Sequence, residues 1–235
     1  MAPQNIIVEL HTNLSKHIDP EYREQARRFS KEEIRLLGVR VPVVRRISAA
    51  HFSEIKNLDK KEVFQICEQL LKKEQEFQTI AFDWLNKIRK KFEPSDFEFF
   101  QHCLENYVSN WAACDDFCTH ALGFFLYKFP QFLPQLKSWA NSENRWMRRA
   151  SAVSLIYSLR KDFYLEDAFG LAQILLEDKD DLVQKGYGWM LKEATKTQQT
   201  DIFNFVMNHK AKMPRTALRY AIEKLPASMK QEAMK

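Results

Sequence analysis

Two tryptophans, one aspartate and several basic residues share a spacing that would place them on common helix faces. Trp111 precedes Asp115 by four residues, and Lys185 precedes Trp189 by the same distance. Residues three or four apart lie on one face of an α-helix. Carboxylates and aromatic ring faces attract positive charge, whereas lysine and arginine bind phosphate groups. The set therefore combines groups that could act on a cationic centre with groups that could hold a polyanion.

Helices are the elements that must position these residues, because helical spacing continues through almost the whole chain. With only 5 glycines and 8 prolines, few tight turns are available, which argues against an all-β fold. No alternating strand pattern of convincing length is present. Gly38 is expected to end one helical segment, and Pro42 to begin the next. The predicted helices are 6–18, 60–73, 75–91, 95–108, 110–127, 131–140, 144–160, 163–177, 180–196, 199–209 and 214–224.

The predicted helices recur with a period of 35–36 residues. Phe77, Met147 and Val183 each open a segment in which an apolar residue is followed by a polar pair and then mostly small residues. The separations are 70 (147 − 77) and 36 (183 − 147), and half of the first is 35. Two helices per repeat at this period are typical of an α-solenoid. We predict an all-α fold, a right-handed α-solenoid of HEAT-like two-helix repeats, as a single domain over residues 1–235.

The repeat register places the candidate residues on the second helix of each repeat. These second helices line the concave surface of a solenoid, so the candidate side chains should converge along one groove. Trp111 lies one position before the apolar opener of its helix and Asp115 three positions after it, while Arg149 and Lys185 both occupy position two. The residues expected to face the groove are Arg45, Trp111, Asp115, Arg149, Lys185 and Trp189.

Each candidate also has a structural interpretation. Tryptophan is buried in most proteins, and we assign Trp84, Trp139 and Trp146 to the core or to packing between repeats. Asp115 is followed by Asp116, and one of this pair is expected to be a solvated or capping carboxylate. Arg148 and Arg149 could be ordinary solvated helix charges.

The remaining composition excludes several classes of function. Apolar residues make up 45% of the 235 residues, which indicates a folded body, and the net charge of +5 is only mildly basic. Cys114 and Cys118 lie near His120, but buried thiols are a better interpretation than a zinc site. No metal or cofactor is expected. No secretory signal or membrane-spanning stretch is recognisable, so we expect a cytoplasmic protein.

Five segments together resemble the AlkD-like DNA alkylation repair glycosylases, a family of HEAT-like helical repeats. The segment from Asn110 to Asp116 resembles the family's Trp-x3-Asp helix. The other four agree in order and approximate spacing, and the resemblance covers roughly the whole chain. They are 37–45 (LGVRVPVVR), 145–150 (RWMRRA), 183–189 (VQKGYGW) and 214–222 (PRTALRYAI).

The resemblance implies specific roles for residues of this chain. The family's lesion-facing cleft carries over onto Trp111, Asp115 and Trp189, with Asp115 as the catalytic residue. Arg149 corresponds to an arginine that contacts phosphates near the lesion. The other expected DNA-binding residues are Arg45, Arg148, Lys185, Arg215 and Arg219. Some relatives have an aromatic residue at the position of Asn110, and a tyrosine can occur at the position of Phe29. These differences concern which lesions are accepted more than the type of reaction.

The implied activity is a monofunctional DNA glycosylase that acts in base excision repair. Its substrates would be N3-alkyladenine and N7-alkylguanine in double-stranded DNA, whose cationic bases leave without a general acid. Asp115 would stabilise the charge that develops on the deoxyribose and position the attacking water. The protein is expected to act as a monomer, to leave an abasic site and to need no Schiff-base lysine.

Two alternatives remain open from the residues themselves. A catalytically silent solenoid that binds damaged or branched DNA would share the basic groove without needing Asp115. A protein-interaction scaffold of the HEAT class is also compatible with the repeat. That scaffold gives no reason for Trp111, Asp115 and Trp189 to share a face.

Overall fold

The computed structural model describes residues 3–29 and 32–235, except the side chains of Pro3, Gln4 and Phe29. Phe29, compared above with a tyrosine, therefore lies outside the described side chains. Every regular element in the described ranges is helical, which confirms the all-α prediction. The chain divides into two compact units, Met1–Asp116 and Phe117–Lys235. A single domain and a groove along the whole chain would each involve both units, and both therefore stay predictions.

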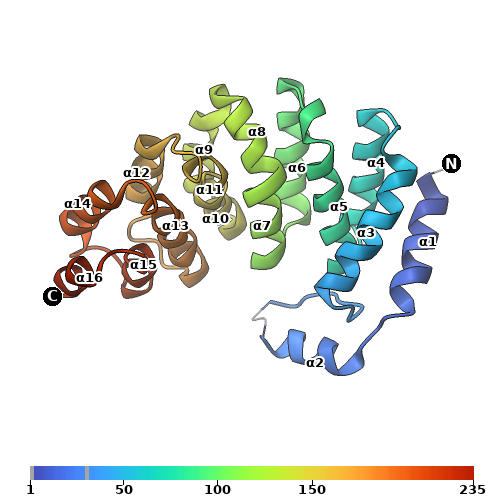
Figure 1. Ribbon diagram of the computed structural model, residues 1–235, viewed down its shortest axis with the longest axis horizontal. Coiled ribbons are helices and arrows are strands. Elements are labelled where there is room, and N and C mark those ends of the chain that lie inside the picture. Colours follow the sequence, from blue (N-terminus) through green and yellow to red (C-terminus); the bar gives the residue numbers. More distant parts are fainter. Residues whose placement is uncertain (1–2, 30–31) are drawn as a thin grey trace. The chain divides into compact units, whose positions relative to one another are not determined.

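Unit 1 consists of helices packed in pairs (Figure 1). Helix α3 packs against α5 in one row, and α4 packs against α6 in a second row that covers α5. Helix α1 packs mainly against α3. The elements are α1 (Pro3–Ser15), α2 (Pro20–Phe29), α3 (Val41–Ile55), α4 (Lys60–Leu71), α5 (Gln75–Lys87), η1 (Arg89–Lys91), η2 (Pro94–Asp96), α6 (Phe97–Tyr107) and α7 (Trp111–Phe117), which ends at the first residue of unit 2.

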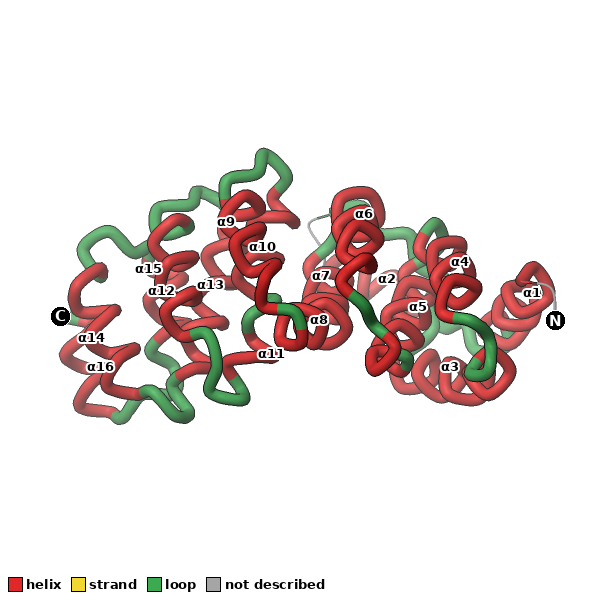
Figure 2. The backbone as a smooth tube through the Cα atoms, turned by 90° about the horizontal axis from the view of Figure 1, so that it is seen from above, coloured by secondary structure: helices red, strands yellow, loops and turns green. Residues whose placement is uncertain are grey.

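Unit 2 has the same two-row construction (Figure 1), and it consists of helices joined by loops (Figure 2). Helices α10, α13 and α15 pack successively in one row, and α9 and α12 lie in the other. Phe169 on α12 stacks on Phe205 of α14 with ring centres 4.8 Å apart, which ties α14 to the second row. The elements are η3 (Cys118–Leu122), α8 (Gly123–Lys128), η4 (Pro130–Phe132), α9 (Leu133–Ala140), α10 (Arg145–Val153), α11 (Ile156–Leu159), α12 (Leu165–Ile174), α13 (Asp181–Ala194), α14 (Gln199–His209), α15 (Arg215–Ala221) and α16 (Ala227–Met234).

Short polar residues begin several of these helices. The side chains of Asp59, Asn144 and Asp180 accept hydrogen bonds from backbone N–H groups in the first turns of α4, α10 and α13, at 2.9 Å in each case. Asp59 also forms a capping box, because its own N–H donates to Glu62 Oε2 at 3.0 Å. Such caps satisfy N–H groups that have no partner inside the helix.

The expectation that Gly38 ends a helix is wrong. Helix α2 ends at Phe29, and Gly38 lies in an irregular segment with φ of +99°. The buried carboxylate of Glu76 holds this segment, since it accepts hydrogen bonds from the backbone N–H groups of Leu37, Gly38 and Val39 at 3.0, 2.8 and 2.9 Å. A side chain from α5 thus replaces the hydrogen bonds that a helix would have supplied.

Two long predicted helices are interrupted. The predicted helix over 110–127 is divided into α7 and α8 by η3, a single π-helical segment. A Cβ on Gly123, where α8 begins, would lie 2.6 Å from the Cys118 carbonyl oxygen and 2.7 Å from Tyr157 Cβ. The predicted helix over 144–160 is likewise divided into α10 and α11 at Ser154 and Leu155.

The core contains the aromatic residues assigned to it. Trp84, Trp139 and Trp146 are 0%, 3% and 7% exposed, which confirms their packing role. The four cysteines are buried thiols, and burial raises the pKa of Cys67 and Cys103. Among the described residues, every helix is too short or too polar to cross a membrane.

Candidate active site and nucleic-acid-binding residues

Trp111 is presented at the beginning of α7 by the residue before it. Asn110 is buried, and its side-chain oxygen accepts a hydrogen bond from the Ala113 N–H at 2.9 Å, while its Nδ2 donates to Gln75 Oε1 at 2.6 Å. The cap fixes where the helix starts. Trp111 is the first residue of the helix and is 36% exposed, an unusual exposure for an indole in this chain.

The two neighbouring aspartates of α7 have different surroundings. Asp116 accepts two hydrogen bonds from Arg45 Nη2, at 2.6 and 2.7 Å to its two oxygens. Asp115 is half-buried and lies four residues after Trp111, on the same face of α7. Asp116 thus forms a partly buried ion pair with Arg45, and Asp115 shares a helix face with the exposed indole.

Arg45 belongs to a charged cluster within unit 1. Its Nη1 lies 3.8 Å from Asp83 Oδ1 and donates to the Thr79 carbonyl at 3.4 Å. Asp83 also accepts short hydrogen bonds from Ser48 and Lys87. A DNA phosphate at Arg45 would have to compete with the carboxylates of Asp83 and Asp116. This geometry does not favour the DNA contact predicted for Arg45.

Arg149 is buried against a glycine in unit 2. Its side chain is on α10, is 5% exposed as a residue, and donates from Nη1 to the Leu182 carbonyl in a short hydrogen bond. A Cβ on Gly186 would lie 3.2 Å from Arg149 Cγ and 3.4 Å from Nη1. Gly186 on α13 therefore leaves the room in which the guanidinium lies.

Arg148, the neighbour of Arg149, is held by protein acceptors. Its Nε donates to Asp178 Oδ2 at 2.7 Å, and its Nη1 donates to the Ser142 and Glu143 carbonyls at 2.9 and 3.1 Å. Arg145 forms a comparable pair with Asp180 at 2.7 Å. Burial would raise the pKa of the Asp180 carboxyl, but hydrogen bonds from Arg145 and the α13 backbone lower it. These arginines join α10 to the turn before α13, and this pairing does not favour the phosphate contact predicted for Arg148.

Lys185 and Trp189 lie on one face of α13 and each contacts a carboxylate four residues away. Lys185 Nζ is 3.0 Å from Asp181 Oδ2, and Trp189 Nε1 donates to Glu193 Oε1 at 3.2 Å. Glu193 is buried and also accepts hydrogen bonds from Arg160, Lys196 and Lys224. Sequence reasoning missed Glu193, although its spacing from Trp189 is the signal that could have found it.

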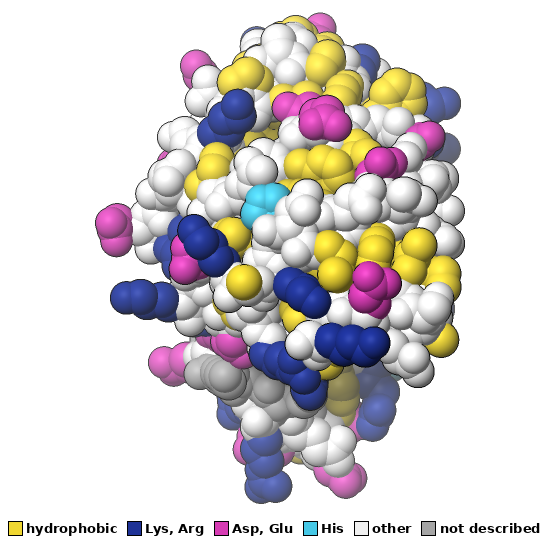
Figure 3. All heavy atoms as spheres, turned by 90° about the vertical axis from the view of Figure 1, so that its left-hand side faces the viewer, with side chains coloured by type: hydrophobic (Ala, Val, Ile, Leu, Met, Phe, Trp, Pro, Cys, Tyr) yellow, Lys and Arg dark blue, Asp and Glu magenta, His cyan; other side chains and the backbone are white. Residues whose placement is uncertain are grey.

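Arg215 and Arg219 are exposed cations on α15. Within the described ranges neither guanidinium has a hydrogen bond or an ion pair, in contrast to Arg45, Arg148 and Arg149. On the face of unit 2 shown in Figure 3, Lys and Arg side chains are mixed with acidic and hydrophobic ones. This face of unit 2 therefore carries side chains of both charges.

The candidate residues are distributed over both units. Arg45, Trp111 and Asp115 belong to unit 1, and the structure places Trp111 and Asp115 on one helix face. The residues of unit 2 are Arg148, Arg149, Lys185, Trp189, Arg215 and Arg219. Their convergence on a single groove stays a prediction.

The sequence matches the family model described as DNA alkylation repair enzyme over residues 10–225. The match covers most of the chain, and the protein therefore belongs to the DNA alkylation repair enzyme family. No curated protein shows a significant sequence match.

Two solved structures are similar in fold. One, described as a predicted DNA alkylation repair enzyme from Enterococcus faecalis, has a TM-score of 0.80 at 18% identity, over 90% of this chain and 98% of that one. The other is the alkylpurine DNA glycosylase AlkC of Pseudomonas fluorescens bound to DNA that contains an abasic site analog. Its TM-score is 0.55 at 14% identity, over 99% of this chain and 65% of that one. This chain thus spans about two thirds of the length of AlkC.

Proposed function

We propose that this protein is a monofunctional alkylpurine DNA glycosylase. It would hydrolyse the N-glycosidic bond of N3-alkyladenine and N7-alkylguanine in double-stranded DNA and thereby act in base excision repair. The observation that carries the proposal is the arrangement on α7, where the exposed indole of Trp111 shares a helix face with Asp115 while Arg45 pairs with Asp116.

The chemistry requires a group that stabilises positive charge on the sugar. An alkylated purine already carries positive charge, so the bond to it breaks without prior protonation of the base. In the proposed reaction the charge develops on the deoxyribose, as in other glycoside hydrolyses. The Asp115 carboxylate stabilises this charge and positions the water that attacks the anomeric carbon. The ring face of Trp111 adds a cation–π contact of about 0.5–2 kcal/mol.

DNA binding in the proposal depends on the cations of unit 2. Arg215 and Arg219, which are exposed, would contact backbone phosphates, with a further contribution from Lys185. Trp189 would contact the lesioned nucleotide, whereas the burial of Arg149 does not favour the phosphate contact predicted for it. The family of the chain and the DNA bound to AlkC support DNA as the partner. We further propose that the protein works as a monomer in the cytoplasm.

Base release from defined DNA tests the proposal. A duplex with a single N7-methylguanine is incubated with the wild-type protein and with Asp115→Asn, and free base is measured. We expect release by the wild type and a loss of at least 100-fold in the variant, with unchanged lesion affinity. The abasic product should remain unnicked on a denaturing gel until alkali is added, because no lysine acts as a nucleophile.

Two results would contradict the proposal. If neither protein releases base while both bind DNA tightly and with strong salt dependence, the chain is a DNA-binding protein without catalysis. If wild type and Asp115→Asn release base equally, the chemistry lies elsewhere. A thermal melt of both proteins shows whether the comparison is between equally folded samples.

A further inference from the structure

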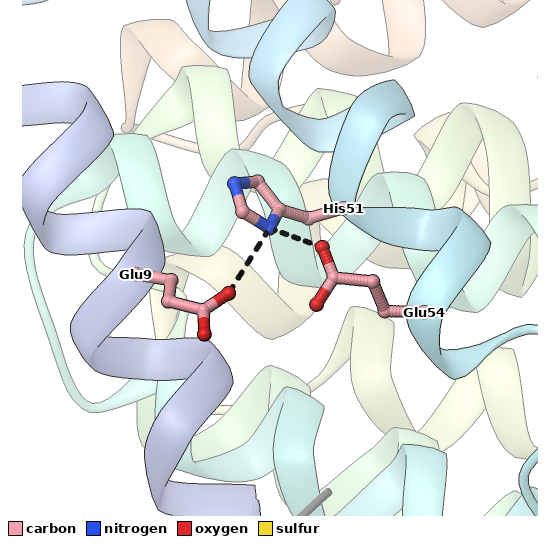
Figure 4. Close-up of side chains that lie close together, drawn as sticks. All are labelled: Glu9, His51 and Glu54. Atoms are coloured by element: carbon pink, nitrogen blue, oxygen red, sulfur yellow. Dashed lines mark ion pairs between the residues drawn. The ribbon is translucent and has the colours of Figure 1, made fainter.

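Three side chains on two helices of unit 1 bring metal-ligand atoms together. Glu9 is on α1, and His51 and Glu54 are on α3 (Figure 4). His51 Nδ1 lies 2.8 Å from Glu54 Oε1 and 4.0 Å from Glu9 Oε2. One nitrogen and two carboxylate oxygens, all within 4.8 Å of one another, thus face a common point.

The histidine of this cluster is aimed at the two carboxylates from a buried position. His51 is 8% exposed, and its Nδ1 is buried. Although a Glu54 oxygen lies close to it, Nδ1 forms no hydrogen bond of suitable geometry with any described residue. Buried polar atoms are nearly always satisfied in folded proteins, so Nδ1 is available either for the ion pair with Glu54 or for a metal ion held with Glu9 and Glu54.

The other ring nitrogen, Nε2, accepts a hydrogen bond from Asn13, and a metal on Nδ1 would require this amide to turn. Asn13 Nδ2 lies 2.9 Å from His51 Nε2, and Lys16 Nζ donates to Asn13 Oδ1 at 3.1 Å. Metal-bound histidines almost always donate their second N–H to an oxygen. A half-turn of the Asn13 amide would present Oδ1 to Nε2–H, and the exposed Lys16 can move away from it.

We propose that Glu9, His51 and Glu54 bind one divalent transition-metal ion. A nitrogen with two carboxylates is a ligand set that zinc accepts, whereas Mg²⁺ and Ca²⁺ prefer oxygen ligands alone. Three protein ligands leave a coordination position for water. The proposal replaces the expectation from the sequence that the chain holds no metal, and it is independent of the glycosylase proposal.

The ion would join α1 to the rest of unit 1. Helix α1 packs mainly against α3, and the cluster supplies one ligand from α1 and two from α3. A ligand that binds the folded state and not the unfolded chain raises the melting temperature as its concentration rises. Metal binding should therefore appear as stabilisation of the whole protein.

Zinc titration of the full-length protein tests the site. We expect calorimetry at pH 7.5 to show one Zn²⁺ per chain and the melting temperature to rise with ZnCl₂. His51→Gln should abolish both effects, and Glu9→Gln and Glu54→Gln should weaken binding at least tenfold. His102→Gln is the matched control, because His102 also faces a glutamate in unit 1, with Nε2 3.7 Å from Glu68 Oε1, but is exposed. This control should bind zinc like the wild type.

A nuclear magnetic resonance measurement distinguishes the site from zinc on surface histidines. In long-range ¹H–¹⁵N spectra, zinc should convert His51 to the tautomer that carries the proton on Nε2, and the resonance is assigned from its loss in His51→Gln. The proposal is overturned if the wild type binds no zinc at millimolar concentration, or if Glu9→Gln binds as tightly as the wild type. Glu9 is on the surface of α1, so its substitution remains informative even if His51→Gln does not fold.

Discussion

Glu193 fixes the edge of the Trp189 indole, because its Oε1 accepts the indole N–H at 3.2 Å. The same carboxylate accepts hydrogen bonds from Arg160 at 2.9 Å, Lys196 at 3.1 Å and Lys224 at 3.2 Å. Burial alone would raise the pKa of the Glu193 carboxyl, but its hydrogen bonds and the charge of Arg160 outweigh this and lower the pKa to about 2. Glu193 is therefore a positioning residue for Trp189.

Replacing Glu193 with Gln should make stability less dependent on pH in the acid range. A carboxyl whose pKa is lower in the folded state stabilises the protein above its unfolded pKa, and this contribution is lost as pH falls through the folded value. We expect Glu193→Gln to melt several degrees below the wild type at pH 7, with the gap narrowing between pH 4.5 and pH 2. A constant gap over that range would show that the charge of Glu193 contributes little.

The effect of Glu193 on base release should pass through Trp189. In the wild-type background, Glu193→Ala removes the acceptor of the indole N–H and should reduce base release. In a Trp189→Phe background, which lacks the indole N–H, the same substitution should have little further effect. A double-mutant cycle on single-turnover rates measures this coupling. Purely additive losses would mean that Glu193 acts on stability alone.

The two aspartates of α7 should separate activity from stability. Asp116→Asn breaks a partly buried ion pair with Arg45, and we expect it to lower the free energy of unfolding by about 1–2 kcal/mol. Asp115→Asn should abolish base release, whereas Asp116→Asn should retain most of it. Urea unfolding checks the stability of Asp116→Asn, and base release from N7-methylguanine DNA is measured for both variants. Equal losses of base release would contradict the distinct roles assigned to the two aspartates.

Helix positions and periodicity were predictable from the sequence because local spacing determines them. The predicted helices 60–73, 75–91 and 199–209 correspond closely to α4, α5 and α14. The irregular segment around Gly38 was not predictable, since it depends on Glu76, which is 38 residues further along the chain. The π-helical interruption at η3 was also missed; at Gly123, where it ends, a Cβ would meet Tyr157 and Ser154, which lie more than 30 residues along the chain, as well as the local Cys118 carbonyl.

The candidate site shows the same limit. The spacing of Trp111 and Asp115 predicted that they share a helix face, and it needed no tertiary information. Which basic residues are already paired could not be read from spacing. Arg45 and Arg148 pair with carboxylates 71 and 30 residues away, whereas Arg215 and Arg219 are exposed. Exposure and pairing of charges thus had to come from the structure.

Two helical glycines should respond in opposite directions to an added methyl group. A Cβ on Gly188 would lie 2.8 Å from the Ala217 carbonyl oxygen and 2.7 Å from Tyr220 Cβ, so Gly188→Ala must push α13 away from α15. We expect a loss of about 1–3 kcal/mol in the free energy of unfolding. Gly170 on α12 has open space, and Gly170→Ala should stabilise by about 0.5–1 kcal/mol. Denaturant unfolding of both variants measures the difference, and a destabilising Gly170→Ala would contradict the packing described.

The salt dependence of DNA binding should distinguish exposed cations from paired ones. Each phosphate contact contributes about 0.9 to the slope of log affinity against log salt concentration. Arg215→Gln and Arg219→Gln should each reduce the slope by roughly one without lowering the melting temperature, since neither guanidinium has a partner in the described ranges.

Arg148→Gln is the matched control for these variants. This substitution removes the bond to Asp178, so it should lower the melting temperature and leave the slope unchanged. Fluorescence anisotropy at four salt concentrations with one unmodified duplex gives the slopes for all three variants. If Arg148→Gln reduces the slope and Arg215→Gln and Arg219→Gln do not, the paired arginine is the phosphate contact and the α15 cations are ordinary solvated charges.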